Sequence, residues 1–264
     1  MHININAGRN KYFEKIQTYR DTIQTLLKRE EIAKKSIHIK GPESAKIRLR
    51  LAEDMLTVSS NYIVLNGVSL SMLKLSNEEA LNESRKTFTR AIVYLEELVS
   101  PFLDVPYSDY EDKLAEISFL SAKKRYDIIK KTGLVLNLLK ETVGENIKWK
   151  WAFVDLEGRY ATVAKNIMNL KTAVANTDPR AEDYEPTVYH IRLIKKLLNQ
   201  AADRYRERYE LYTNIPEDFN MGIKFLNALK RIHIILGERS DAESVKKKSD
   251  TWAGKLETDQ KQKK

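Results

Sequence analysis

The sequence contains no cysteine and few of the residues that usually interrupt helices. Its 264 residues include nine glycines, six prolines and four histidines. The lack of cysteine excludes a disulfide scaffold, a thiolate zinc site, an iron–sulfur cluster and a cysteine nucleophile. The scarcity of glycine and proline excludes collagen-like and Pro/Gly-rich disordered chains. Because 42% of the residues are hydrophobic, the chain is able to bury a sizeable core.

Recognised catalytic and phosphate-binding motifs are missing as well. The sequence has neither a glycine-rich phosphate loop nor the glycine-flanked serine of hydrolases. Its histidines, His2, His38, His190 and His233, form no metal-binding pair at helical spacing. The acidic clusters stand mostly at expected helix starts, where the helix dipole favours negative charge. We therefore expect no catalytic residue, no metal site and no cofactor, and we predict that the protein is not an enzyme.

Long apolar runs are also lacking. No window approaches about 18 uninterrupted apolar residues, the length that a membrane-spanning helix needs. The first residues do not show the apolar stretch of a secretory signal peptide. The sequence therefore predicts a cytoplasmic protein without a transmembrane segment.

Apolar residues recur instead at steps of three and four. One seam runs from Trp149 to Val174, a second from Val188 to Tyr212, and a third from Tyr12 to Leu26. Such spacing places the apolar residues on one face of a helix, and sustained alternation by two, which would indicate strands, is not found. We predict an all-α fold in which these seams are buried.

Turn signals divide the chain into about seven long helices. The expected breaks are Gly41-Pro42, the segment 101–107 with two prolines, Gly144, the segment 176–179, and the segment 214–216. Ser76 and Ser108, each followed three residues later by a glutamate, predict capped helix starts. Helix 43–75 is apolar on two faces and is expected in the middle. Short connections predict an elongated antiparallel bundle or a short helical-repeat solenoid.

The C-terminal residues have a different composition. Residues 238–264 are polar and rich in lysine, and Trp252 is their single aromatic residue. This composition is typical of a mobile segment that cannot bury enough apolar surface to fold. We predict one helical domain over 1–237, followed by a flexible lysine-rich tail over 238–264.

Positive charge is concentrated in particular blocks. The net charge is +9, and the blocks 1–50 and 119–176 carry net charges of +7 and +6. Lys123, Lys130 and Lys131 recur near one helical face, and Trp151 lies off its apolar seam. These four residues are the predicted partner-binding residues. Blocks of charge are also ordinary on solvated helix exteriors, so this alternative stays open.

Three functions compete on this evidence. Long helices, sustained seams and the lack of catalytic motifs favour a non-catalytic scaffold that binds a protein partner through grooves or a basic surface. The positive charge favours an acidic partner, and a homo-oligomer remains open. The alternative is a nucleic-acid-binding protein that uses the basic blocks and tail. A third is an enzyme with a polar site inside the bundle that no motif reveals.

Overall fold

A computed structural model describes residues 5–35, 37, 41–144 and 147–262, and its regular secondary structure over these ranges is helical. The predicted all-α bundle is therefore confirmed. Contacts group the chain into two compact units, where the sequence predicted a single domain over 1–237. Unit 1 comprises Met1–Leu98 and Ile128–Asn146, and unit 2 comprises Val99–Asp127 and Ile147–Lys264.

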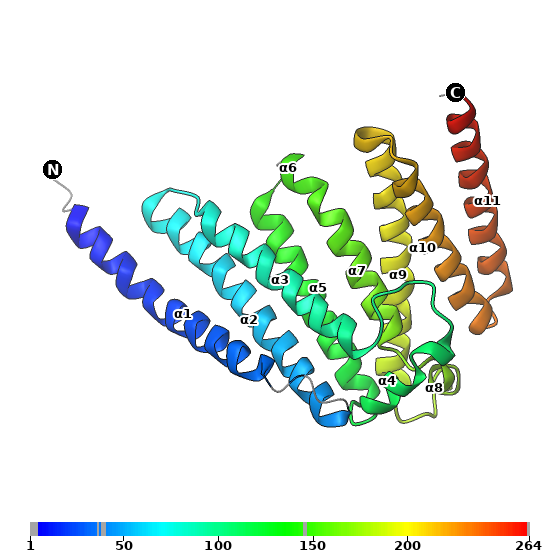
Figure 1. The fold of residues 1–264 in the computed structure, drawn as a ribbon, viewed down its shortest axis with the longest axis horizontal. Coiled ribbons are helices and arrows are strands. Elements are labelled where there is room, and N and C mark those ends of the chain that lie inside the picture. Colours follow the sequence, from blue (N-terminus) through cyan, green and yellow to red (C-terminus); the bar gives the residue numbers. More distant parts are fainter. Residues whose placement is uncertain (1–4, 36, 38–40, 145–146, 263–264) are drawn as a thin grey trace. The chain divides into compact units, whose positions relative to one another are not determined.

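Unit 1 is built around its second helix. Helix α2 (Pro42–Leu73) packs against both α1 (Ile5–Lys34) and α3 (Glu78–Leu98), as its two apolar faces predict (Figure 1). Over the described residues, α2 is also the one helix that is long and apolar enough to cross a membrane, a test that buried core helices pass too. The start of α3 is capped by Asn77, whose Oδ1 accepts from the Ala80 amide at 3.0 Å, and not by the predicted Ser76.

A buried carboxylate joins α1 to α3 in unit 1. Glu30 accepts hydrogen bonds from Arg90 at 2.6 Å and from the Tyr94 hydroxyl at 2.7 Å. Lys34, one turn further along α1, lies 3.2 Å from the same carboxylate. Burial and this carboxylate raise the pKa of Tyr94 above its ordinary value. A buried charge needs such partners, so Glu30 links α1 to α3 through these side-chain contacts.

Unit 2 contains most of the remaining helices. In chain order they are η1 (Tyr107–Asp109), α4 (Glu111–Glu116), α6 (Ile147–Lys150), α7 (Ala152–Asn166), α8 (Leu170–Ala175), α9 (Tyr184–Arg208), η2 (Tyr209–Thr213), α10 (Pro216–Ile235) and α11 (Arg239–Gln262). Helix α9 packs against α7 and α10, and α10 packs against α11 (Figure 1). Helix α5 (Ala122–Val143) contributes its first turns to unit 2 and the rest to unit 1.

The close approach of α7 to its neighbours depends on a glycine. A Cβ atom at Gly158 would lie 2.8 Å from a ring carbon of Tyr205 on α9 and 3.2 Å from the ring tip of Phe225 on α10. These two rings stack on each other with centroids 5.6 Å apart. Only glycine leaves room for the stacked pair against the α7 backbone.

The Trp149 seam is interrupted, contrary to the continuous helix that its spacing predicts. Its residues from Phe153 to Ile167 are buried, but α7 ends at Asn166. The Asn169 side chain then accepts from the Lys171 amide at 3.1 Å and caps the new helix α8. The chain therefore changes direction, and Val174 at the end of the seam is exposed.

The predicted flexible tail is wrong for residues 239–262. They form α11, whose Ala242, Trp252 and Leu256 are buried. The Trp252 ring lies 5.6 Å from that of Phe219 on α10, and Arg206 on α9 lies 5.1 Å above its face. One large aromatic residue with smaller apolar residues at helical spacing is enough to dock a helix that is otherwise polar.

Candidate functional site

The four predicted partner-binding residues lie in different surroundings. Lys123 is exposed on α5 and forms an ion pair with Asp127 at 2.8 Å, which raises the pKa of Lys123. Lys130 and Lys131 are exposed on the part of α5 that belongs to unit 1. Trp151 stands between α6 and α7 in unit 2 and contacts Lys150 and Tyr212. Of the four, Trp151 alone has an aromatic neighbour among the described residues.

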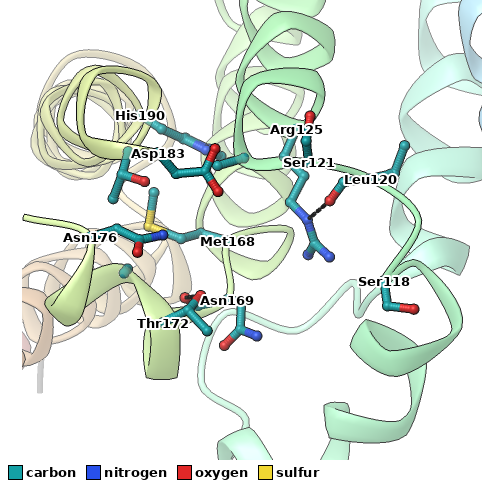
Figure 2. A pocket seen from close by; sticks show the side chains of 13 residues that line it. Ser118, Leu120, Ser121, Arg125, Met168, Asn169, Thr172, Asn176, Asp183 and His190 are labelled. Carbon is teal, nitrogen blue, oxygen red and sulfur yellow. Dashed lines mark hydrogen bonds between the residues drawn. The ribbon is translucent and has the colours of Figure 1, made fainter. Parts of the chain in front are cut away.

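A pocket of about 240 Å³ opens within unit 2. The segment after α4, the first turns of α5, helix α8 and the start of α9 form its walls. Figure 2 shows Asp183 and His190 on the α9 side and Arg125 on the α5 side, with Asn169 and Thr172 below. Sequence reasoning did not identify this pocket, because its residues come from four separate segments with no shared motif.

Arg125 holds two helix ends beside this pocket. Its guanidinium donates to the carbonyl oxygens of Leu120 at 3.0 Å, Ile117 at 3.0 Å and Ile167 at 2.8 Å. Ile117 and Ile167 are the C-terminal caps of α4 and α7. The last carbonyl groups of a helix have no partner within it and carry partial negative charge, so a buried cation stabilises both ends at once.

His190 is a neutral histidine in the pocket wall. Its Nε2 lies 3.0 Å from the Ala164 carbonyl oxygen, which can only accept, so Nε2 carries the proton and Nδ1 is an acceptor. Burial lowers the pKa of His190 to about 4, although the Ala164 hydrogen bond opposes this, and the charge of Arg125 lowers it further. At neutral pH the pocket therefore presents an acceptor nitrogen and not a cation at this position.

Acid should destabilise unit 2 through His190. Between pH 6.5 and pH 4 the unfolded chain protonates this histidine while the folded chain does not, so stability falls as pH falls through this window. We expect the free energy of unfolding to drop by about 3 kcal/mol more in the wild type than in His190→Gln between pH 7 and pH 4. Urea titrations at several pH values measure the difference. Parallel pH profiles for the two proteins would contradict the assignment.

One cluster in unit 2 contains residue types that bind metal ions, but a lysine side chain already pairs with its central carboxylate. His233, Glu238 and Asp241 each offer a ligand atom, all within 4.8 Å of one another. Lys195 already bonds both carboxylate oxygens of Glu238, at 2.5 and 2.6 Å. The ammonium group occupies the place of a cation, so the cluster fits a charge network better than a metal ion. His2 and His38 lie outside the described residues.

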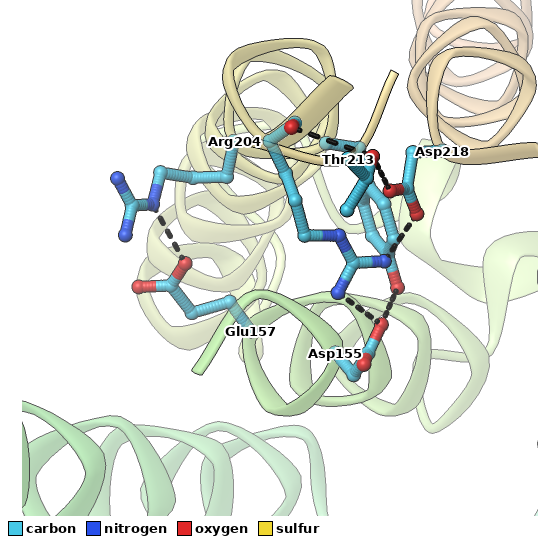
Figure 3. Close-up of polar contacts among 7 residues, drawn as sticks. Asp155, Glu157, Arg204, Thr213 and Asp218 are labelled. Atoms are coloured by element: carbon cyan, nitrogen blue, oxygen red, sulfur yellow. Dashed lines mark hydrogen bonds and ion pairs between the residues drawn. The ribbon is translucent and has the colours of Figure 1, made fainter. Parts of the chain in front are cut away.

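A polar network shapes the turn between α9 and α10. Arg208 bonds Asp155 on α7 at 3.1 Å and Asp218 on α10 at 2.5 Å, and Tyr205 donates to Asp155 at 3.0 Å. Thr213 completes the network by donating to Asp218 at 2.6 Å. Figure 3 shows Asp155, Thr213 and Asp218 of this network, which belong to α7, η2 and α10. The network fixes η2, which is a π-helical turn of five residues.

This π-helical turn presents apolar residues to solvent. Leu211 and Tyr212 are 68% and 62% exposed, and Ile215 just beyond is 49% exposed. The Tyr212 ring stacks on Trp151 with centroids 5.4 Å apart and an interplanar angle of 13°. Lys150 lies 4.7 Å from the Trp151 ring centre. We call Trp151, Leu211, Tyr212 and Ile215 the aromatic patch.

The aromatic patch corrects one sequence-based expectation. Seam spacing predicts that Tyr212 is buried, because it assumes an α-helix through residue 212. A π-helical turn holds more residues per turn, so Tyr209 stays in the core while Tyr212 rotates outward. The nearby Asn214-Ile215-Pro216 segment signals that the helix ends, but not that its last turn changes type.

Comparison with known proteins gives one partial match and one nearly complete match. Over 114 residues the chain is 29% identical to the C subunit of the V-type proton ATPase of Saccharomyces cerevisiae. The matched region covers 43% of this chain and 27% of that protein, so the similarity concerns about a quarter of the yeast protein. No solved structure matches the chain. A family model matches residues 8–260, and the chain therefore belongs to the TP0443 family.

Proposed function

We propose that this protein is a non-catalytic subunit that binds a protein partner through the aromatic patch of unit 2. The observation that carries the proposal is the exposure of Leu211 and Tyr212 beside the stacked Trp151. Stacked aromatic residues lose little conformational entropy on binding and dominate the energy of many protein interfaces. An exposed apolar cluster on a turn that a partly buried ion network holds in place is typical of a preformed docking surface.

The partial likeness to an ATPase subunit supports the same class of function. That relative is one component of a multi-subunit assembly, as its name states. We propose that this chain likewise works within an assembly, and that V-type proton ATPase subunits are the first partners to look for. The basic residues Lys130 and Lys131 would then attract an acidic region of such a partner, as the sequence predicts.

The proposal is tested by replacing two residues of the aromatic patch. The tagged full chain and the double variant Leu211→Ser, Tyr212→Ser are captured from the source cells after nuclease treatment, and the bound proteins are quantified by mass spectrometry. We expect the main partner to fall by on the order of tenfold or more in the variant, because interface hot spots contribute about 2 kcal/mol or more each. Trp151→Ala should act in the same direction.

A matched control separates this effect from a general loss of apolar surface. Ile234 and Ile235 are also exposed, at 59% and 43%, and belong to the same unit. The variant Ile234→Ser, Ile235→Ser should keep the partner. Equal recovery from the patch variant and the wild type would overturn the proposal. Loss of every partner on nuclease treatment would favour nucleic-acid binding, with its steep dependence on salt.

A further inference from the structure

The pocket of unit 2 has an acceptor wall on α9. Asp183, Thr187 and His190 follow at steps of four and three, so they share one face of the helix. The Asp183 carboxylate has no side-chain partner within the described part of the chain, and the Nδ1 atom of His190 is an acceptor. A wall with a carboxylate and a ring nitrogen that both accept is suited to a cationic donor such as an ammonium group.

The opposite wall of the pocket, on the α5 side, carries positive charge. Arg125 lies there with Ser121, and the positively charged guanidinium of Arg125 is part of the pocket lining. The guanidinium stays protonated at any ordinary pH. Its field reaches across the pocket, since it contributes to the lowered pKa of His190. A negatively charged group of a ligand is therefore favoured on the α5 side.

The size and lining of the pocket narrow the class of ligand. A cavity of about 150 Å³ holds benzene, so a pocket of about 240 Å³ accommodates a molecule of on the order of ten non-hydrogen atoms. Its described lining includes no Phe, Tyr or Trp side chain on which a nucleobase or a sugar would stack. Met168 and Ala173 add a small apolar surface beside the polar groups. These features match a compact ligand with opposite charges at its two ends.

We infer that the pocket binds a free α-amino acid. Its ammonium group would lie at Asp183 and His190, and its carboxylate would lie on the side of Arg125 and Ser121. The side chain of the amino acid would face Met168 and Ala173. This inference concerns a surface separate in sequence from the aromatic patch and does not depend on the proposed function.

The test uses the wild-type full chain and isothermal titration with each common L-α-amino acid at millimolar concentration. We expect at least one to bind, and its α-amide and its N-acetyl derivative to bind at least tenfold more weakly, because each derivative lacks one of the two charges. Failure of all the amino acids to bind would overturn the inference. Equal binding of either derivative would overturn the assigned charge pairing.

A variant of the acceptor wall locates the binding site. Asp183→Asn should weaken binding of the same amino acid at least tenfold, because the amide removes the negative charge with little change in shape. Glu182→Gln, at the exposed neighbouring position outside the pocket, is the matched control and should bind like the wild type. If Asp183 only stabilises the N-terminus of α9 through the helix dipole, Asp183→Asn changes the thermal midpoint and leaves amino-acid binding intact. That result would overturn the assignment of Asp183 to the binding site.

Discussion

Arg125→Met should lower the free energy of unfolding of unit 2 by about 3–5 kcal/mol. The methionine side chain has similar length but leaves the carbonyls of Ile117, Leu120 and Ile167 without the donor that they share. Two of these carbonyls end helices, so the change acts on α4 and α7 together.

Urea unfolding followed by tryptophan fluorescence measures this effect. All three tryptophans, Trp149, Trp151 and Trp252, belong to unit 2, so their emission reports on that unit. The matched control is Lys124→Met at the exposed preceding position, which should change stability by no more than about 0.5 kcal/mol. If the two variants were equally stable, water would be satisfying the carbonyls in place of Arg125.

Trp252→Ala should release α11 from unit 2. The indole is 4% exposed and contacts Phe219, Arg206 and Lys248, so its removal should cost about 3–5 kcal/mol. Most of the remaining α11 surface is polar, and Ala242 and Leu256 bury little by comparison. We expect amide hydrogen exchange along 239–262 to speed up by a factor of about 100 or more, on the order that this free energy implies.

Trp252→Phe is the control for this second prediction. Phenylalanine keeps an aromatic ring against Phe219, so exchange along α11 should stay slow. Exchange that is already fast in the wild type would contradict the docked helix and restore the sequence-based expectation of a flexible tail. Circular dichroism is the appropriate stability measurement here, because the substitution removes one of the fluorescent residues.

The apolar periodicity predicted the helical class and much of the core. The seam residues Ile16, Ile194, Leu198 and Phe153 are all buried, and α2 has helices packed on two sides, as its two apolar faces indicate. Periodicity succeeds here because burial of a helix face is the main source of tertiary stability. It does not distinguish one long helix from two shorter ones with a cap between them, as Asn169 shows.

The candidate site was harder to predict than the helices, because it depends on side chains that meet only in the folded chain. Trp151 was found because it lies off its seam, but its partner Tyr212 was assigned to the core. The change from α-helix to π-helix at Tyr209 depends on Arg208, Asp155 and Asp218, which meet only after folding. The pocket depends in the same way on Arg125 and α9, which are distant in sequence. Such side-chain networks have no periodic signal.

The division of α5 between the two units has a consequence for folding during synthesis. Helices α1 to α3 leave the ribosome first, but the segment 128–146 that belongs with them follows only after residues 99–127 of the other unit. Unit 1 is therefore incomplete while part of unit 2 is already outside the ribosome, and apolar surface that α5 will cover stays accessible to chaperones. For the same reason, cutting the chain at any one peptide bond cannot yield one intact unit on each side of the cut.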